Sequence, residues 1–202
     1  MFVRTENFRT FIHLYPIVTA IIALQIGLWL IFLIPVPAFS LFFSLFAGFN
    51  AGIANGEWWR LITPIFLHTG FYHLFFNTVS LILFAPALER ILNRVLFLII
   101  YFGSGIFANL ATYWLEPLAF THVGASGAIF GLFGVYLFMV LFRKDLIDAA
   151  NSQVVITILV IGVIMTFLNT NINIAAHLFG LIGGFLLGSI FLRSRKTRSP
   201  WR

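Results

Sequence analysis

The sequence contains the segment SGAIFGLFGVYLFMVLF, residues 126–142. It is a continuous apolar run without a charged residue, and its length fits the roughly 17 to 25 residues of a membrane-spanning helix. Its first residue is a serine that stands between Ala125 and Gly127. Such a serine either helps to pack helices together or carries chemistry. The rest of the sequence decides between these two readings.

The composition of the whole chain predicts an integral membrane protein. Of 202 residues, 61% are hydrophobic and 9% are charged, whereas soluble domains carry about 25% charged residues. The absence of cysteine excludes disulfides, cysteine nucleophiles and cysteine-based metal sites. The net charge of +6 does not predict nucleic-acid binding, because the charges lie at the termini and between the apolar runs. We expect a single membrane domain over residues 1–202.

Six apolar runs have the length of membrane helices. They cover approximately residues 16–34, 71–88, 95–114, 126–142, 153–169 and 174–192. We expect the fifth helix to be short. Glycine, asparagine and proline interrupt residues 38–69, which predicts a long loop in the membrane interface, where Trp58 and Trp59 belong. The expected fold is an all-α bundle of six transmembrane helices.

The positively charged residues predict the orientation of this bundle. With six helices, eleven of the twelve basic residues fall on one side and only Arg60 falls on the other. A seventh span within residues 38–69 would invert the orientation of all the helices that follow it. The distribution of basic residues argues against such a span. Basic residues favour the cytoplasmic side, so both termini are expected in the cytoplasm. The basic tail, residues 193–202, is most simply a topology anchor near anionic lipid.

Unusual polar residues lie in the first turns of three predicted helices. His73 and Asn77 share one face of the second helix, Ser126 begins the fourth, and His177 lies near the start of the sixth. These helices all start on the outer side, so the four side chains should lie at similar depth. Each residue alone is more simply explained by packing. Matched depth on three helices favours one polar pocket that opens to the outside.

These side chains fit hydrolysis by a serine nucleophile. Neutral imidazole can take a hydroxyl proton near pH 7, which makes His177 the candidate base for Ser126. The N–H groups at a helix start, together with Asn77 and His73, can hold an oxyanion. All six acidic residues lie in loops or at span ends, so we expect a Ser–His dyad without an acidic third member. Phe130 follows Ser126 by one helical turn and can pack on the imidazole instead.

Glycines on the fourth and sixth helices predict that these two helices touch. They repeat at helical spacing, as Gly127, Gly131 and Gly134 on one helix and as Gly180, Gly184 and Gly188 on the other. Small residues at such spacing let helix backbones approach closely. Close contact would bring Ser126 and His177 within hydrogen-bonding reach.

Four motifs occur in order along nearly the whole chain: EWWRLITPIFLH (57–68), HLFFN (73–77), GASGAIFG (124–131) and AHLFG (176–180). Each motif is weak alone. Together they make the chain resemble the rhomboid family of intramembrane serine proteases. The resemblance implies Ser126 as nucleophile and His177 as general base. It also implies that Asn77, His73 and the Ser126 N–H donate to the oxyanion.

The resemblance extends to residues outside the reacting pair. Trp59 and Arg60 match a structural Trp-Arg pair of the first loop in the family. Phe76 matches an aromatic residue near the substrate gate, and Gly180 matches the glycine where the sixth helix meets the fourth. Phe130 stands where some members have tyrosine, so its ring can still pack on the histidine but any role of that hydroxyl is absent here.

The resemblance implies hydrolysis of a peptide bond in or near the transmembrane segment of single-span membrane proteins, through an acyl-enzyme. It implies no metal, organic cofactor or nucleic acid. We expect a prokaryotic plasma membrane and a site that opens on the extracytoplasmic side. Because a helical substrate must unwind to be cut, small or helix-breaking residues near the scissile bond should favour cleavage.

Three alternative functions are less consistent with the sequence. A catalytically dead relative that only binds membrane clients would usually lack the serine or the histidine, and this chain has both. A transporter or channel would need polar residues that continue inward, whereas these helices become apolar. A membrane metalloprotease would need a His-Glu-x-x-His pair, which is absent.

Overall fold

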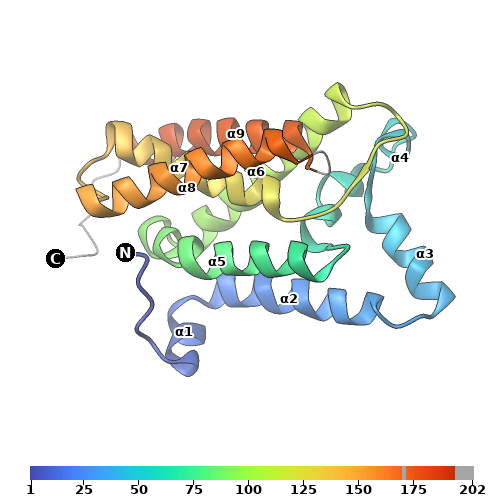
Figure 1. The fold of residues 1–202 in the computed structure, drawn as a ribbon, viewed down its shortest axis with the longest axis horizontal. Helices are drawn as coiled ribbons and strands as arrows, with labels where there is room; N and C mark the ends of the chain where they lie inside the picture. Colours follow the sequence, from blue (N-terminus) through green and yellow to red (C-terminus); the bar gives the residue numbers. More distant parts are fainter. Residues whose placement is uncertain (170–171, 194–202) are drawn as a thin grey trace.

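The computed structural model describes residues 1–169 and 172–193 and is mostly helical. Its long helices are α2 (Pro16–Phe32), α5 (Phe71–Leu92), α6 (Arg94–Leu115), α7 (Ser126–Phe142), α8 (Ala149–Leu168) and α9 (Ile174–Leu192). They correspond to the six predicted apolar runs, so each run is confirmed as a helix. The beginning of the chain and the end of α9 lie at the same end of the bundle (Figure 1). Apart from Arg193, the basic tail that was predicted to anchor the topology lies outside the described residues.

The helix lengths show a multi-pass membrane protein. Among the described residues, α5, α6, α8 and α9 are long and apolar enough to cross a membrane. A fifth span is formed if α2 is joined to α1 (Phe8–Leu14), although the two are bent by 112°. With 17 residues, α7 is shorter. It lies inside the bundle, where it packs against α5, α6, α8 and α9, and most of its residues are buried.

Two predictions about local structure are wrong. The fifth predicted helix is not short, since α8 has 20 residues. Asp148 caps its first turn by accepting a hydrogen bond of 2.8 Å from the Asn151 backbone N–H, and this polar turn precedes the apolar run. The segment 38–69 is not simply a long loop either. It contains most of α3 (Pro37–Phe46), then β1 (Gly48–Phe49), α4 (Asn50–Ala54) and two 3-10 turns, η1 (Trp58–Leu61) and η2 (Thr63–Phe66).

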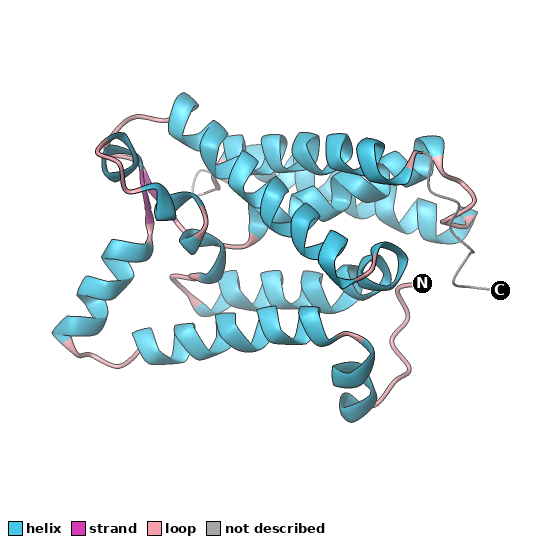
Figure 2. Cartoon of the chain, turned by 180° about the vertical axis from the view of Figure 1, so that it is seen from behind, coloured by secondary structure: helices cyan, strands magenta, loops and turns pink. Residues whose placement is uncertain are grey.

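The α3–η2 segment forms a separate layer at one end of the bundle (Figures 1 and 2). With ten residues, α3 is about 15 Å long and too short to cross a bilayer. Strand β1 pairs antiparallel with β2 (Thr121–His122), with Gly48 opposite His122. This short sheet ties the segment to the loop that leads into α7.

The side chains of Trp59 and Arg60 hold the end of α3. The last carbonyl groups of a helix lack partners within the helix. Trp59 donates a hydrogen bond of 3.1 Å to the Leu45 carbonyl, and Arg60 donates bonds of 2.7 Å to the carbonyls of Ser44 and Ala47. Arg60 is buried and also pairs with Glu57. Trp59 and Arg60 therefore fix the position of α3, and they lie away from the centre of the bundle.

Helices α7 and α9 meet through their backbones. A Cβ atom added to Gly180 would overlap the Gly127 carbonyl oxygen and lie 2.9 Å from its carbonyl carbon. A Cβ atom added to Gly184 would collide in the same way with the backbone of Gly131. Only glycine permits this approach, so the contact predicted from the glycine spacing is confirmed. It sets the separation between the start of α7 and the start of α9.

Candidate active site

Two cavities meet at the start of α7. The lateral cavity lies between α5, α7, α8 and α9 and has a volume of about 460 Å³. The loop cavity lies beside β2 and the end of α3 and has a volume of about 440 Å³. Four residues line both cavities, namely His73, Ser126, Ile172 and His177. The predicted nucleophile and base therefore stand where the two cavities join.

Ser126 is the first residue of α7, as predicted. The preceding glycine, Gly124, has φ +124°, a backbone conformation that favours glycine. A Cβ atom at Gly124 would lie 2.5 Å from the His73 Nε2 atom, so a larger residue would also displace that ring. The N–H groups of the first turn of a helix have no partner within the helix and carry the positive end of its dipole. The turn thus presents a hydroxyl and backbone donors together.

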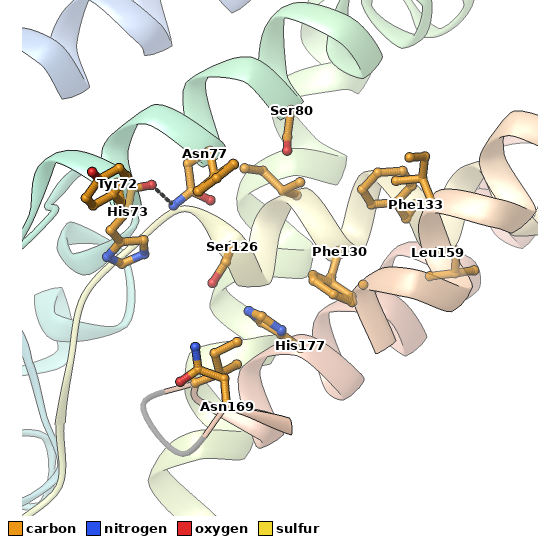
Figure 3. A pocket seen from close by; sticks show the side chains of 15 residues that line it. Tyr72, His73, Asn77, Ser80, Ser126, Phe130, Phe133, Leu159, Asn169 and His177 are labelled. Atoms are coloured by element: carbon orange, nitrogen blue, oxygen red, sulfur yellow. Dashed lines mark hydrogen bonds between the residues drawn. The ribbon is translucent and has the colours of Figure 1, made fainter. Parts of the chain in front are cut away.

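His177 lies in the first turn of α9, with its side chain directed towards Ser126 (Figure 3). The turn is fixed by Asn173, whose side chain accepts a hydrogen bond of 2.9 Å from the Ala176 N–H. The Phe130 ring stacks on the imidazole, with ring centroids 4.1 Å apart and planes inclined by 17°. The imidazole is therefore held by an aromatic face, as the one-turn spacing of Phe130 from Ser126 indicated.

The Nδ1 atom of the His177 ring has a partner on α8. It lies 2.8 Å from the Thr166 hydroxyl oxygen. Thr166 is not among the site residues predicted from the sequence. Thr166 lies eleven residues before His177 in the chain, and nothing in a single sequence indicates that α8 would place it beside the ring. Among the described residues that line either cavity, none is acidic.

Asn77 and His73 lie on the α5 wall of the lateral cavity, opposite α9 (Figure 3). The Asn77 side chain donates a hydrogen bond of 2.9 Å to the His73 carbonyl, which fixes the amide and leaves its second N–H for another acceptor. The His73 ring packs edge-on against His68, with centroids 4.9 Å apart. The structure thus brings these two predicted donors to the same cavity as Ser126 and His177.

The remaining predicted residues fall into two groups. Phe76 lines the lateral cavity beside Asn77 and is 64% exposed, which puts its ring at the rim rather than inside. Trp59, Arg60 and Gly180 line neither cavity. They act on the framework, through the end of α3 and through the α7–α9 contact.

Helix α8 forms the loosely packed wall of the lateral cavity. Only 17% of the apolar stretch of α8 is buried inside the protein, whereas the corresponding share is 39% to 50% for α5, α6 and α9. It contributes Ile158, Leu159 and Gly162 to the cavity lining. A wall with so few contacts can move at lower cost than the α7–α9 pair.

Two histidines with enclosed ring nitrogens, His68 and His122, were not predicted from the sequence. Burial lowers the pKa of His68 to about 3, with a further contribution from the nearby His73. Burial also lowers the pKa of His122 to about 4. The His122 imidazole has no hydrogen-bond partner among the described residues. His122 lines the loop cavity, so this cavity has a more polar wall than the lateral one.

The fold and the site define a multi-pass helical membrane protein in which a serine and a histidine face a shared pocket. Residues 55–194 match the rhomboid domain family. The chain is 60% identical over 98% of its length to YdcA of Bacillus subtilis, which is covered completely and whose name places it among rhomboid proteases.

Two further relatives agree with this match. The chain is 41% identical over 67% of its length to the rhomboid protease GluP of Bacillus subtilis, 26% of which is covered. It is 28% identical over 93% of its length to rhomboid-like protease 1 of Toxoplasma gondii, 68% of which is covered. The chain belongs to the rhomboid family, as the motifs indicated, and its enzyme class is that of the serine proteases.

Proposed function

We propose that this protein is an intramembrane serine endopeptidase that cuts the transmembrane segments of single-span membrane proteins. The observation that carries the proposal is the arrangement of Ser126 and His177, which point towards one another where the two cavities join (Figure 3). Family membership supports the reaction class, and the cavity supports the roles of the individual residues.

In the proposed mechanism, His177 takes the proton of the Ser126 hydroxyl as the oxygen attacks the scissile carbonyl. The Asn77 amide, the His73 ring and the Ser126 N–H stabilise the oxyanion that forms. His177 then returns the proton to the leaving amine, and an acyl-enzyme remains on Ser126. A water molecule that is activated by His177 hydrolyses this ester and restores the free serine. The reaction requires neither a metal nor an organic cofactor.

The two cavities suggest separate routes for substrate and water. The lateral cavity is mainly apolar and is bounded by the loosely packed α8 and by Phe76, which suits entry of a substrate segment from the lipid. The loop cavity has polar walls and reaches the same serine, which suits entry of water. A substrate helix must unwind before its carbonyl can reach Ser126, so glycine or other poor helix formers near the scissile bond should be favoured.

We propose that the single domain, residues 1–202, crosses a prokaryotic plasma membrane six times, through α2 and α5 to α9. Helix α7 counts as a span although it is about 25 Å long, because the helices that surround it isolate it from lipid. The excess of basic residues on one side supports cytoplasmic termini and a site that opens to the extracytoplasmic face. Nucleic acid is not a partner in this proposal.

The test is cleavage of a single-span reporter by the purified protein in detergent. Wild type and Ser152→Ala should cut, because the Ser152 hydroxyl donates to the Asp148 carbonyl at the start of α8 and lines neither cavity. Ser126→Ala and His177→Ala should not cut. Equal cleavage by all four proteins would refute the dyad. If the wild type neither cuts nor reacts with a fluorophosphonate at Ser126, the function becomes the binding of membrane clients without cleavage.

A further inference from the structure

Thr166 links α8 to the imidazole of His177 through a chain of two hydrogen bonds. The Thr166 hydroxyl lies 2.7 Å from the Gly162 carbonyl oxygen and 2.8 Å from His177 Nδ1. Thr166 has 0% exposure and His177 has 8%. Both contacts are thus shielded from solvent, where a well-placed hydrogen bond matters most.

The Thr166 hydroxyl has a single proton, and this determines which group donates in each of the two hydrogen bonds. A threonine hydroxyl has one proton to donate. The Gly162 carbonyl can only accept, so the bond at 2.7 Å uses that proton. The hydroxyl oxygen can then only accept from the ring, which requires a proton on Nδ1 of His177. In neutral imidazole the second nitrogen, Nε2, is then unprotonated.

We infer that Thr166 is a positioning residue that holds His177 in the tautomer with the proton on Nδ1 and with an unprotonated Nε2 available to Ser126. The inference rests on the proposed function, because a base is needed only if Ser126 is a nucleophile. It supplies the orienting partner that the acidic residues do not provide. Unlike a carboxylate, a hydroxyl carries no charge, so it selects the tautomer without strongly stabilising the imidazolium.

The Phe130 stack and the Thr166 bond act on different motions of the ring. Stacking restricts tilting of the imidazole plane, with the planes inclined by only 17°. The bond to Nδ1 fixes the rotation of the ring within that plane. Together the two contacts leave the imidazole one orientation. The Phe130 ring alone would not determine which nitrogen faces Ser126, because stacking does not restrict rotation within the ring plane.

The experiment compares Thr166→Val, which keeps the shape and removes the hydroxyl, with Thr166→Ser, which keeps the hydroxyl. Thr157→Val is the matched control, because Thr157 lies on the same helix, is exposed and accepts a hydrogen bond of 3.4 Å from the Gln153 side chain, away from both cavities. For reporter cleavage, we expect kcat to fall roughly tenfold in Thr166→Val with KM unchanged. Thr166→Ser and Thr157→Val should resemble the wild type.

The second measurement is the tautomer itself, from the ring-nitrogen NMR signals of protein labelled with ¹⁵N-histidine at mildly alkaline pH. The His177 signals are those missing from His177→Ala. We expect the Nδ1–H form in wild type and Thr166→Ser, and a shift towards the Nε2–H form in Thr166→Val. This readout needs no cleavage, so it tests the inference even if the protein proves not to be a protease.

Three results would overturn the inference. The first is an Nε2–H tautomer in the wild type, which can be read even if Thr166→Val does not fold. The second is a Thr166→Val protein with unchanged tautomer, whatever its kcat. The third is a kcat for Thr166→Ser as low as that of Thr166→Val, which would assign the effect to the lost packing of the methyl group.

Discussion

Replacing Gly180 by alanine should separate the nucleophile from the base without touching either of them. The added Cβ would overlap the Gly127 carbonyl oxygen and lie 2.9 Å from its carbonyl carbon. Carbon atoms in contact normally lie about 3.5 to 4.0 Å apart, so the two backbones must separate by about 1 Å. Gly127 directly follows Ser126, and Gly180 lies one turn after His177. The displacement therefore acts almost fully on the separation of the two side chains.

A misplacement of about 1 Å costs roughly 100-fold in rate. We expect a fall of this order in kcat for Gly180→Ala, together with about 1 to 3 kcal/mol of lost stability from overpacking. The assays are reporter cleavage, the rate of fluorophosphonate labelling at Ser126, and heat denaturation in detergent. Both rates should fall while most of the protein remains folded at the assay temperature.

Gly188→Ala is the control on the same helix. A Cβ atom there would lie 3.4 Å from Phe138 and Val135 atoms, which is ordinary contact. Alanine also favours a helix over glycine by up to about 1 kcal/mol, so this variant should be active and no less stable than the wild type. If Gly180→Ala cuts as fast as Gly188→Ala, the argument that the α7–α9 backbone contact sets the site geometry is wrong.

Three further predictions concern individual side chains of the framework and the site. Arg60→Ala should lower the stability by about 3 kcal/mol in heat denaturation, because two carbonyls at the end of α3 lose a charged donor. Phe130→Leu removes the ring that stacks on His177, so we expect kcat to fall about fivefold with little change in KM, and an unchanged kcat would contradict a role for the stack. Burial lowers the pKa of His68 to about 3 and that of His122 to about 4, so the unfolded chain binds protons that the folded chain excludes. The contribution of these two histidines to the free energy of unfolding should therefore be fully present above about pH 6.5. Below that pH, the free energy of unfolding should fall by about 1.4 kcal/mol per pH unit for each histidine. His122→Phe should flatten that dependence in denaturation measured from about pH 7 to about pH 5.

The helices could be predicted because hydropathy is a local property of the chain. Each apolar run became a helix, and the glycine spacing on α7 and α9 indicated their contact. The length of α8 was missed because a local polar cap at Asp148 begins the helix before its apolar run, whereas α3 was missed because residues outside it hold its end. The end of α3 is held by Trp59 and Arg60, which follow it in the chain, and such a contact leaves no pattern in residues 37–46.

The candidate site shows the same division. Ser126, His177, Asn77 and His73 could be grouped because helix direction and depth follow from the order of the spans. Thr166 could not, because a threonine in an apolar helix usually bonds only its own backbone. Its second bond, to His177, exists because α8 packs beside α9 at that depth.

The junction of the two cavities has a practical consequence for inhibition. A compound that fills the lateral cavity would compete with the incoming peptide, so more substrate would overcome it. A compound that enters the loop cavity, beside His122 and Thr121, would reach the same serine by the other route. If such a compound stops short of the serine, it would leave the peptide bound and deprive the acyl-enzyme of water, so its potency would not fall as substrate accumulates. The geometry thus offers two chemically different kinds of inhibitor against a single serine.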